Sequence, residues 1–253
     1  MCGAAANFLL PFGQQTEAFM PFVRQHLEAL ANFLMPNTCP ACGDGLGTSK
    51  IPLCWRCLQQ LPLTQFEGMQ DNPVNRMFFG RLPLEYASAM LFFNAGALAQ
   101  QLVHQIKYKG NQELGIYMGQ LMGQAMQNTA WGNSIDVVVP LPLNAKKLKK
   151  RGYNQSMLLC QGIAQILQKP IENVAVVRKV YTQTQTRKTR MQRWSNVAEV
   201  FDLKTADILV NKHVLLVDDV VTTGATLDAC GQKLVQIPGL RLSVNCLAFA
   251  SKI

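Results

Sequence analysis

The stretch VLLVDDVVTTGATL, residues 214–227, carries the strongest evidence for the fold. Its first four residues are apolar without polar alternation, which is typical of a strand buried on both faces of a sheet. Two acids, Asp218 and Asp219, come next, and a turn rich in threonine leads into an apolar helical pattern over residues 227–235. The stretch therefore predicts a strand, turn and helix unit of an α/β protein.

The same alternation extends over residues 87–253, for which we predict one domain. Strands are expected at residues 88–93, 135–139, 174–177, 213–217 and 242–249, and helices at 97–106, 114–127, 155–167 and 227–235. Because the strand segments are mostly continuous apolar runs, they favour a mostly parallel, doubly wound sheet with helices on both faces. In such sheets ligands bind at the carboxyl ends of the strands.

Three segments precede this domain. Residues 1–35 include an amphipathic helical pattern over 14–35, residues 36–60 contain paired cysteines, and residues 61–86 have little periodicity, which predicts a linker. The 253 residues are 49% hydrophobic and 15% charged, which excludes a disordered or fibrous chain. No apolar run is long enough for a membrane span and no basic leader begins the chain, so we expect a cytoplasmic protein.

The paired cysteines predict a metal site. Cys39, Cys42, Cys54 and Cys57 form two CxxC motifs separated by eleven residues, a spacing that lets two tight turns present four thiolates to one tetrahedral ion. We interpret the motif as a structural zinc knuckle. Four thiolates leave no open coordination position, so the metal is expected to stabilise the fold and not to catalyse.

The two acids and the turn after them predict a ligand site. Adjacent carboxylates repel each other by roughly 1 to 3 kcal/mol, so their presence suggests that they accept hydrogen bonds from a diol or help to hold a metal ion. The turn offers backbone N–H groups and hydroxyls at a helix N-terminus, which together favour a phosphate. Its residues are Thr222, Thr223, Gly224, Ala225 and Thr226.

A diol-binding pair beside a phosphate cradle describes a ribose 5-phosphate site. The stretch resembles the 5-phosphoribosyl 1-pyrophosphate (PRPP) motif of type I phosphoribosyltransferases. This resemblance implies that Asp218 and Asp219 are the catalytic residues and orient the sugar with Mg²⁺ nearby, while residues 222–226 hold the 5-phosphate. An ordinary strand, turn and helix junction is the structural alternative. A P-loop nucleotide site is disfavoured because no GxxxxGK[ST] sequence occurs.

The net charge of +9 is concentrated in the second half of the chain, where 17 of the 24 lysines and arginines follow residue 130. Pro140 and Leu141 are expected to turn at the end of a strand and to bind PRPP near its pyrophosphate. Arg151, at the end of the basic loop that follows, is a further candidate PRPP-binding residue. Residues 181–196 are polar and basic, as in a mobile lid. Basic residues such as these attract nucleic acid or a phosphorylated small molecule, although a solvated loop is the alternative. The candidate nucleic-acid-binding residues are Lys146, Lys147, Lys149, Lys150, Arg187, Arg190 and Arg193.

Several short motifs together resemble the ComF family of competence proteins. They are KYKG at 107–110, VPLPL at 139–143, RGYNQ at 151–155, VDDVVTTGAT at 217–226 and the double CxxC, and the resemblance extends over residues 36–250. It implies a phosphoribosyltransferase fold that serves DNA uptake on the cytoplasmic side.

Three functional hypotheses follow. The protein is an active phosphoribosyltransferase that acts on an unidentified base, or a factor that binds single-stranded DNA and uses the PRPP site as a sensor. The third is a zinc-dependent adaptor that docks a partner such as a helicase of the uptake machinery. The oligomeric state is left open by the sequence.

Overall fold

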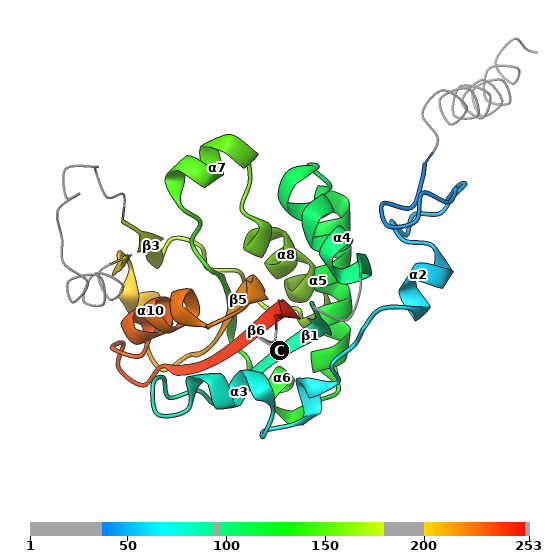
Figure 1. Ribbon diagram of the computed structural model, residues 1–253. Coiled ribbons are helices and arrows are strands. Elements are labelled where there is room, and N and C mark those ends of the chain that lie inside the picture. Colours follow the sequence, from blue (N-terminus) through cyan, green and yellow to red (C-terminus); the bar gives the residue numbers. More distant parts are fainter. Residues whose placement is uncertain (1–36, 94–96, 180–199, 251–253) are drawn as a thin grey trace, which may run out of the picture.

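A four-stranded parallel sheet with the strand order β1-β6-β5-β2 forms the centre of the protein (Figure 1). The computed structural model describes residues 37–93, 97–179 and 200–250. The strands of the sheet are β1 (Tyr86–Phe92), β6 (Arg241–Phe249), β5 (His213–Val221) and β2 (Val137–Pro140). A separate antiparallel pair consists of β3 (Val176–Arg178) and β4 (Phe201–Leu203). The parallel α/β sheet predicted from the sequence is confirmed.

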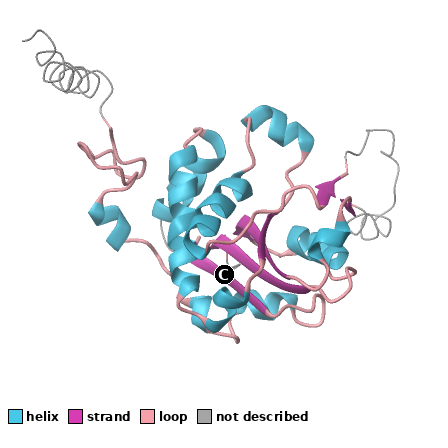
Figure 2. Cartoon of the chain, turned by 180° about the vertical axis from the view of Figure 1, so that it is seen from behind, coloured by secondary structure: helices cyan, strands magenta, loops and turns pink. Residues whose placement is uncertain are grey.

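Helices cover both faces of the sheet, as Figure 2 shows from behind. One face is covered by α4 (Ala97–Tyr108), α5 (Gln112–Gln127), α6 (Ala130–Ser134) and α8 (Gln155–Leu167). The other face is covered by α3 (Pro73–Phe78) and α10 (Ala225–Leu234). The remaining helical segments are α2 (Trp55–Gln59), α7 (Ala145–Arg151) and the short 3-10 turns η1 (Phe66–Gly68) and η2 (Ala206–Leu209). None of the described helices is both long and apolar enough to span a membrane.

The apolar run of β5 is continuous because the strand is buried on both faces. Val214 and Leu216 belong to the core under α3 and α10, whereas Leu215 and Val217 belong to the core under α5 and α8. All four side chains are fully buried. Alternate side chains thus enter opposite cores, which explains why no polar alternation appears in this part of the sequence.

Glycines allow α5 and α8 to pack in direct backbone contact. A Cβ atom added at Gly162 of α8 would lie 2.0 Å from the carbonyl oxygen of Ile116, and one at Gly119 of α5 would lie 2.2 Å from that of Leu159. Any side chain at these positions would force the two helices apart, at a typical cost of about 1–3 kcal/mol. This close packing fixes the position of α8 on α5. The first turn of α8 contributes to the site described below.

Three segments differ from the sequence-based expectation. The strand expected at residues 174–177 is β3, which lies outside the parallel sheet and pairs antiparallel with β4. The basic stretch expected to be a loop is the helix α7, which is capped at its N-terminus by Asn144 and followed at its C-terminus by Gly152 in the left-handed conformation. Residues 61–86, which we predicted as a linker, contain η1 and α3 and bury Phe66 and Phe78 in the core. The helix expected over residues 14–35 and the lid expected over 181–196 lie outside the described residues.

Candidate functional site

The two acids lie inside β5, and a different helix contacts each of them. Ser156 Oγ, in the first turn of α8, donates a hydrogen bond of 3.1 Å to Asp218 Oδ1, and the backbone N–H of Asp219 donates to the same oxygen at 2.8 Å. Lys107 Nζ, in the last turn of α4, lies 2.8 Å from Asp219 Oδ1. The Asp219 side chain is 13% exposed, so this ion pair is largely shielded from water.

The environment of Asp218 changes its protonation. Burial, and after it the negative charge of Asp219, raises the pKa of Asp218 to about 7, although hydrogen bonds from Asp219 and Ser156 act in the opposite direction. A carboxyl group with this pKa exchanges a proton close to neutral pH. Asp218 can therefore accept a hydrogen bond from a ligand hydroxyl when it is ionised and donate one when it is protonated.

The threonine turn after β5 is accessible to a ligand. Thr222, Thr223 and Ala225 are exposed, and Gly224 precedes α10 with a φ of +69°. A Cβ atom at Gly224 would lie 2.8 Å from the ring of Phe78, so both the backbone conformation and the close packing on α3 require glycine here. The exposed hydroxyls and the N-terminus of a ten-residue helix give this turn the chemistry of an anion site.

The motif RGYNQ positions the elements around the acids. Asn154 caps α8 by accepting a hydrogen bond from the Ser156 N–H, and its amide donates to the Leu141 carbonyl oxygen at 3.0 Å. The Leu141 N–H donates to the carbonyl oxygen of Val217, so the turn after β2 lies beside the acids. The hydroxyl of Tyr153 donates to the carbonyl oxygen of Ile106, which joins the motif to α4.

The other predicted site residues lie in different environments after β2 and on α7. Pro140 ends β2, and the Leu141 side chain is buried in the core under α3 and α10, so Leu141 can offer only backbone groups to a ligand. The Arg151 guanidinium lies over the Tyr108 ring, 5.0 Å from its centroid. Lys146, Lys147, Lys149 and Lys150 are all exposed on α7. Arg187, Arg190 and Arg193 lie outside the described residues.

Sequence reasoning missed the roles of Lys107 and Ser156. Lys107 belongs to the KYKG motif, but nothing in the sequence pairs it with an acid that lies 112 positions further on. Ser156 directly follows RGYNQ and resembles an ordinary residue of a helix first turn. Both contacts arise because α4 and α8 end or begin at the edge of the sheet where β5 carries its acids.

The four N-terminal cysteines form a cluster that could hold a metal ion. Their Sγ atoms all lie within 4.8 Å of one another, and a tetrahedral zinc ion with Zn–S bonds of about 2.3 Å would separate its sulfur ligands by about 3.8 Å. Burial acts to raise the pKa of the Cys39 thiol, but backbone N–H groups of Cys54, Cys42 and Ala41 together lower this pKa to about 7. Burial, and after it hydrogen bonds with the neighbouring thiols, raises the pKa of Cys57, so the fit of the cluster to a zinc ion rests on the four-sulfur geometry.

The cysteine segment is attached to α4. The Pro40 carbonyl oxygen accepts a hydrogen bond of 3.0 Å from Gln105, and Leu53 and Cys57 are buried in the same core as α4 and α5. The other described cysteines are separate. Cys160, Cys230 and Cys246 are fully buried, and burial raises the pKa of each thiol, so they behave as small apolar residues.

The structure thus defines a parallel α/β protein with an acidic pair, an exposed threonine turn at the N-terminus of α10 and a four-cysteine cluster. The DNA utilization protein YhgH of Salmonella typhi is 30% identical over 214 residues, which cover 83% of each chain. Competence protein F of Haemophilus influenzae is 34% identical over 116 residues, or 46% of this chain and 51% of that protein. The chain belongs to the ComF family of competence and DNA utilization proteins.

Two further comparisons add little about function. No family model matches the chain. An adenine phosphoribosyltransferase of known structure is 18% identical, with a TM-score of 0.32 over 60% of this chain and 69% of that one. A likeness at this level carries no argument about what this chain binds.

The raised pKa of Asp218 predicts how stability depends on pH. Between its ordinary pKa of 3.8 and about 7, the carboxyl group is ionised in the unfolded chain but protonated in the folded protein, so the wild type loses stability as pH rises through this window. Asp218→Asn removes this loss. We expect the variant to be more stable than the wild type above pH 7, by roughly 1–4 kcal/mol, with the difference vanishing near pH 4.

Urea denaturation at several pH values measures this difference. Asp202→Asn is the matched control, because Asp202 has a 57% exposed side chain and its replacement should change stability little at any pH. If Asp218→Asn were less stable than the wild type at neutral pH, the raised pKa of Asp218 in the folded protein would be contradicted.

Proposed function

We propose that this protein binds PRPP with Mg²⁺ at the carboxyl end of β5 and acts in the uptake or use of external DNA on the cytoplasmic side. The observation that carries the proposal is the arrangement of Asp218 and Asp219 directly before an accessible turn at the N-terminus of α10. The ComF relatives bear names that refer to competence and DNA utilization, which supports the biological part of the proposal.

Each part of the site suits one part of the ligand. The carboxylates accept hydrogen bonds from the two ribose hydroxyls, and residues 222–226 supply N–H and hydroxyl donors to the 5-phosphate. When bound, Mg²⁺ neutralises part of the pyrophosphate charge, and the two acids are the residues that would hold it. Lys107 offsets the charge of Asp219, and at 2.8 Å it competes with a hydroxyl or a cation for that oxygen.

A phosphoribosyl transfer reaction is a second candidate function. A cavity of about 500 Å³ borders Pro140 and is walled by side chains of α7 and α8, among them Leu148 and Met157. Amide groups of Gln161 and Asn173 also line it, and they can form hydrogen bonds with the edge of a base. Release of pyrophosphate from PRPP in the presence of one base of a panel would establish this activity. If no base of the panel led to release of pyrophosphate, the activity would be excluded for that panel.

The exposed lysines of α7 favour direct contact with single-stranded DNA. Lys146, Lys147, Lys149 and Lys150 follow the carboxyl end of β2 within one short helix, so they form a dense positive surface at the same edge of the sheet as the acids. Such a surface neutralises phosphates of a single strand without reading its sequence. PRPP and DNA would then bind to neighbouring parts of one edge.

We propose that zinc occupies the cysteine cluster and has a structural role. Four sulfur ligands leave no coordination position for a substrate. The segment of residues 37–57 contains tight turns, including Gly43 with a φ of +82°, and little core of its own, so a metal is expected to hold it together. A surface that docks a helicase of the uptake machinery is the alternative role of this segment.

Removal of both acids tests the ligand site. Wild-type protein should bind PRPP in the presence of Mg²⁺, and Asp218→Asn combined with Asp219→Asn should weaken binding by about 100-fold or more, because two charge-assisted contacts to the ribose hydroxyls are lost. Isothermal titration calorimetry measures both affinities, and Asp202→Asn serves as the control acid. Equal affinities of the wild type and the double variant would refute the site.

Replacement of the α7 lysines tests the DNA contact. The variant with Lys146, Lys147, Lys149 and Lys150 changed to glutamine should bind an oligonucleotide more weakly, and the salt dependence of log K should become shallower by up to about 3. Fluorescence anisotropy over a series of salt concentrations gives both values. The control carries Lys204→Gln and Lys212→Gln, two exposed lysines elsewhere. A wild type that binds no DNA at low salt would remove this part of the proposal.

Metal analysis tests the cysteine cluster. Purified protein should contain one equivalent of zinc, and Cys39→Ser or Cys57→Ser should lose the metal and lower the melting temperature, since unliganded turns cannot keep residues 37–57 folded. Cys230→Ala is the control, because Cys230 is a residue of α10 that is buried in a different core from the cysteine cluster, and its replacement should leave the zinc content unchanged. Loss of zinc without any loss of stability would favour the adaptor alternative over a structural role.

A further inference from the structure

An apolar cavity of about 560 Å³ lies between the chain that follows the cysteine segment and the helix α5. Its apolar walls are formed by the side chains of Leu58, Leu61, Leu63, Met90 and Leu121. The cavity borders β1, the edge strand of the sheet, whereas the acids lie on β5, two strands away. It is therefore separate from the proposed PRPP site.

The backbone around the cavity is held in place by contacts with the rest of the fold. The N–H of Thr64 donates to the Met90 carbonyl oxygen at 2.9 Å, and Trp131 Nε1 donates to the carbonyl oxygen of Glu67 at 2.6 Å. Between these two anchors, Gln65 has a φ of +60°, a left-handed conformation that residues other than glycine seldom adopt. Strained backbone of this kind persists where surrounding contacts determine it, so this wall of the cavity is preformed.

The cavity wall contains a carboxyl group without a partner. Glu67 lines the cavity, and its Oε1 atom is buried and accepts no hydrogen bond from any described residue. Burial raises the pKa of this carboxyl group, because an enclosed carboxylate lacks the water that would stabilise its charge. Buried polar groups are nearly always hydrogen-bonded, so the unpaired oxygen points to a ligand that supplies a donor.

The other lining residues favour a cationic donor. No lysine or arginine is among the described residues of the wall, although the chain carries a net charge of +9. Tyr117 of α5 adds a half-buried hydroxyl, which can accept a second hydrogen bond from a ligand. An acidic wall without basic residues attracts a positive group and repels phosphates, so it suits neither PRPP nor DNA.

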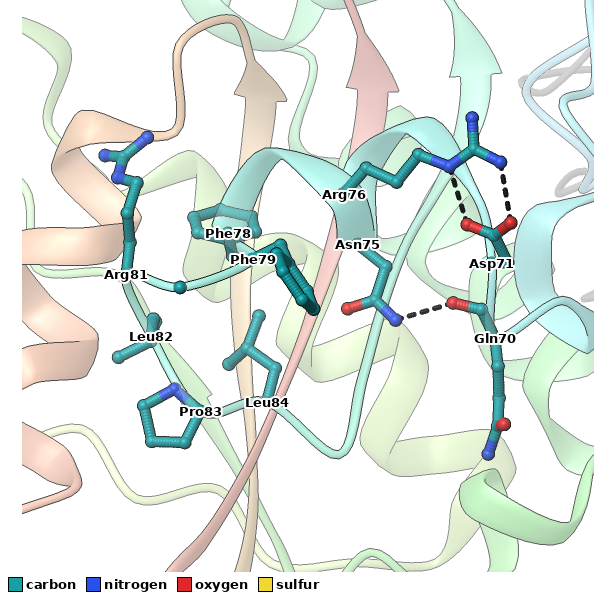
Figure 3. A pocket seen from close by; sticks show the side chains of 11 residues that line it. Gln70, Asp71, Asn75, Arg76, Phe78, Phe79, Arg81, Leu82, Pro83 and Leu84 are labelled. Atoms are coloured by element: carbon teal, nitrogen blue, oxygen red, sulfur yellow. Dashed lines mark hydrogen bonds and ion pairs between the residues drawn. The ribbon is translucent and has the colours of Figure 1, made fainter.

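A hollow of about 610 Å³ beside the segment that joins α3 to β1 lacks this signal (Figure 3). There Arg76 forms two hydrogen bonds of 2.6 Å with Asp71, and Arg81 lies 2.6 Å from Asp228. The charged side chains that line this hollow are thus paired within the chain, and they indicate no charge for a ligand.

We propose that the cavity beside α5 binds a small molecule with an apolar body and a protonated amine. Its volume lies within the range of small-molecule sites. Leu61 and Leu121 enclose the apolar body, and the ammonium group donates to the Glu67 carboxylate and the Tyr117 hydroxyl oxygen. The terminal torsion of a glutamate side chain is soft, so the carboxylate can turn an oxygen toward this donor. A charge-assisted hydrogen bond then selects an amine over an alcohol of the same length.

Isothermal titration calorimetry of the full-length protein with three probes of similar length tests the proposal. The probes are octylamine, octanol and octanoate, whose head groups are positive, neutral and negative. Octylamine should bind about 10-fold or more tightly than octanol, because its ammonium group donates a charge-assisted hydrogen bond. Octanoate should bind more weakly than octanol, because its charge repels the carboxylate of the wall.

Replacement of the carboxyl group separates the contribution of the charge from that of the apolar walls. Glu67→Gln should lower the affinity for octylamine by about 10-fold or more and leave the affinity for octanol unchanged, which also shows that the cavity is intact. Glu113→Gln is the matched control, because Glu113 is an exposed acid in the first turn of α5. Leu63→Gln should weaken octylamine and octanol alike, because the half-exposed Leu63 contributes only apolar contact.

Four results would overturn the proposal. Three of them are a wild type that does not bind octylamine, a wild type that binds octylamine and octanol equally, and a Glu67→Gln variant that binds octylamine as tightly as the wild type. The fourth is loss of octylamine binding when Asp218→Asn is combined with Asp219→Asn, because this loss would place the amine at the acids of β5. Unchanged octylamine binding in that double variant keeps the test independent of PRPP binding.

Discussion

Two adjacent carboxylates inside a parallel strand form the constraint on which the rest of the structure depends. Their mutual repulsion, together with the burial of Asp218, disfavours folding and must be offset by neighbouring elements. Lys107 offsets the charge of Asp219, and Ser156 satisfies one oxygen of Asp218. A chain selected for stability alone would not place two acids here, which is the physical reason to regard this end of β5 as a ligand site.

The helix α4 connects this site to the cysteine cluster. Gln105 holds the Pro40 carbonyl oxygen of the cysteine segment, and Lys107, two residues later, pairs with Asp219. A metal ion held by the four cysteines would order this segment, and it would thereby also fix the hydrogen bond between Gln105 of α4 and the Pro40 carbonyl oxygen. The carbonyl oxygen of Ile106 accepts the Tyr153 hydroxyl between these two contacts, so three separate motifs of the sequence converge within three residues.

The sequence predicted the structure best where interactions between residues close together in the chain determine it. The α/β alternation follows from apolar periodicity, and the helix predicted over residues 155–167 has those same bounds in α8. The basic stretch at α7 was misinterpreted because charge dominates its composition, whereas Asn144 and Gly152 supply good helix caps. The contacts of Lys107 and Ser156 could not be foreseen, since each joins elements that are distant in the chain and meet only through the packing of α4 and α8 on the sheet.

The threonine turn after β5 packs against the segment that joins α3 to β1. Gly224 keeps its left-handed conformation against the ring of Phe78, and Arg81 Nη1 lies 3.5 Å from the Thr223 carbonyl oxygen. Residues 76–82 thus contact the turn through Phe78 and Arg81, whereas the ring of Phe79 in the same segment is exposed to solvent. A substitution that displaced Phe78 or Leu82 from the core would therefore also disturb the turn, because these two side chains anchor the segment that packs against Gly224.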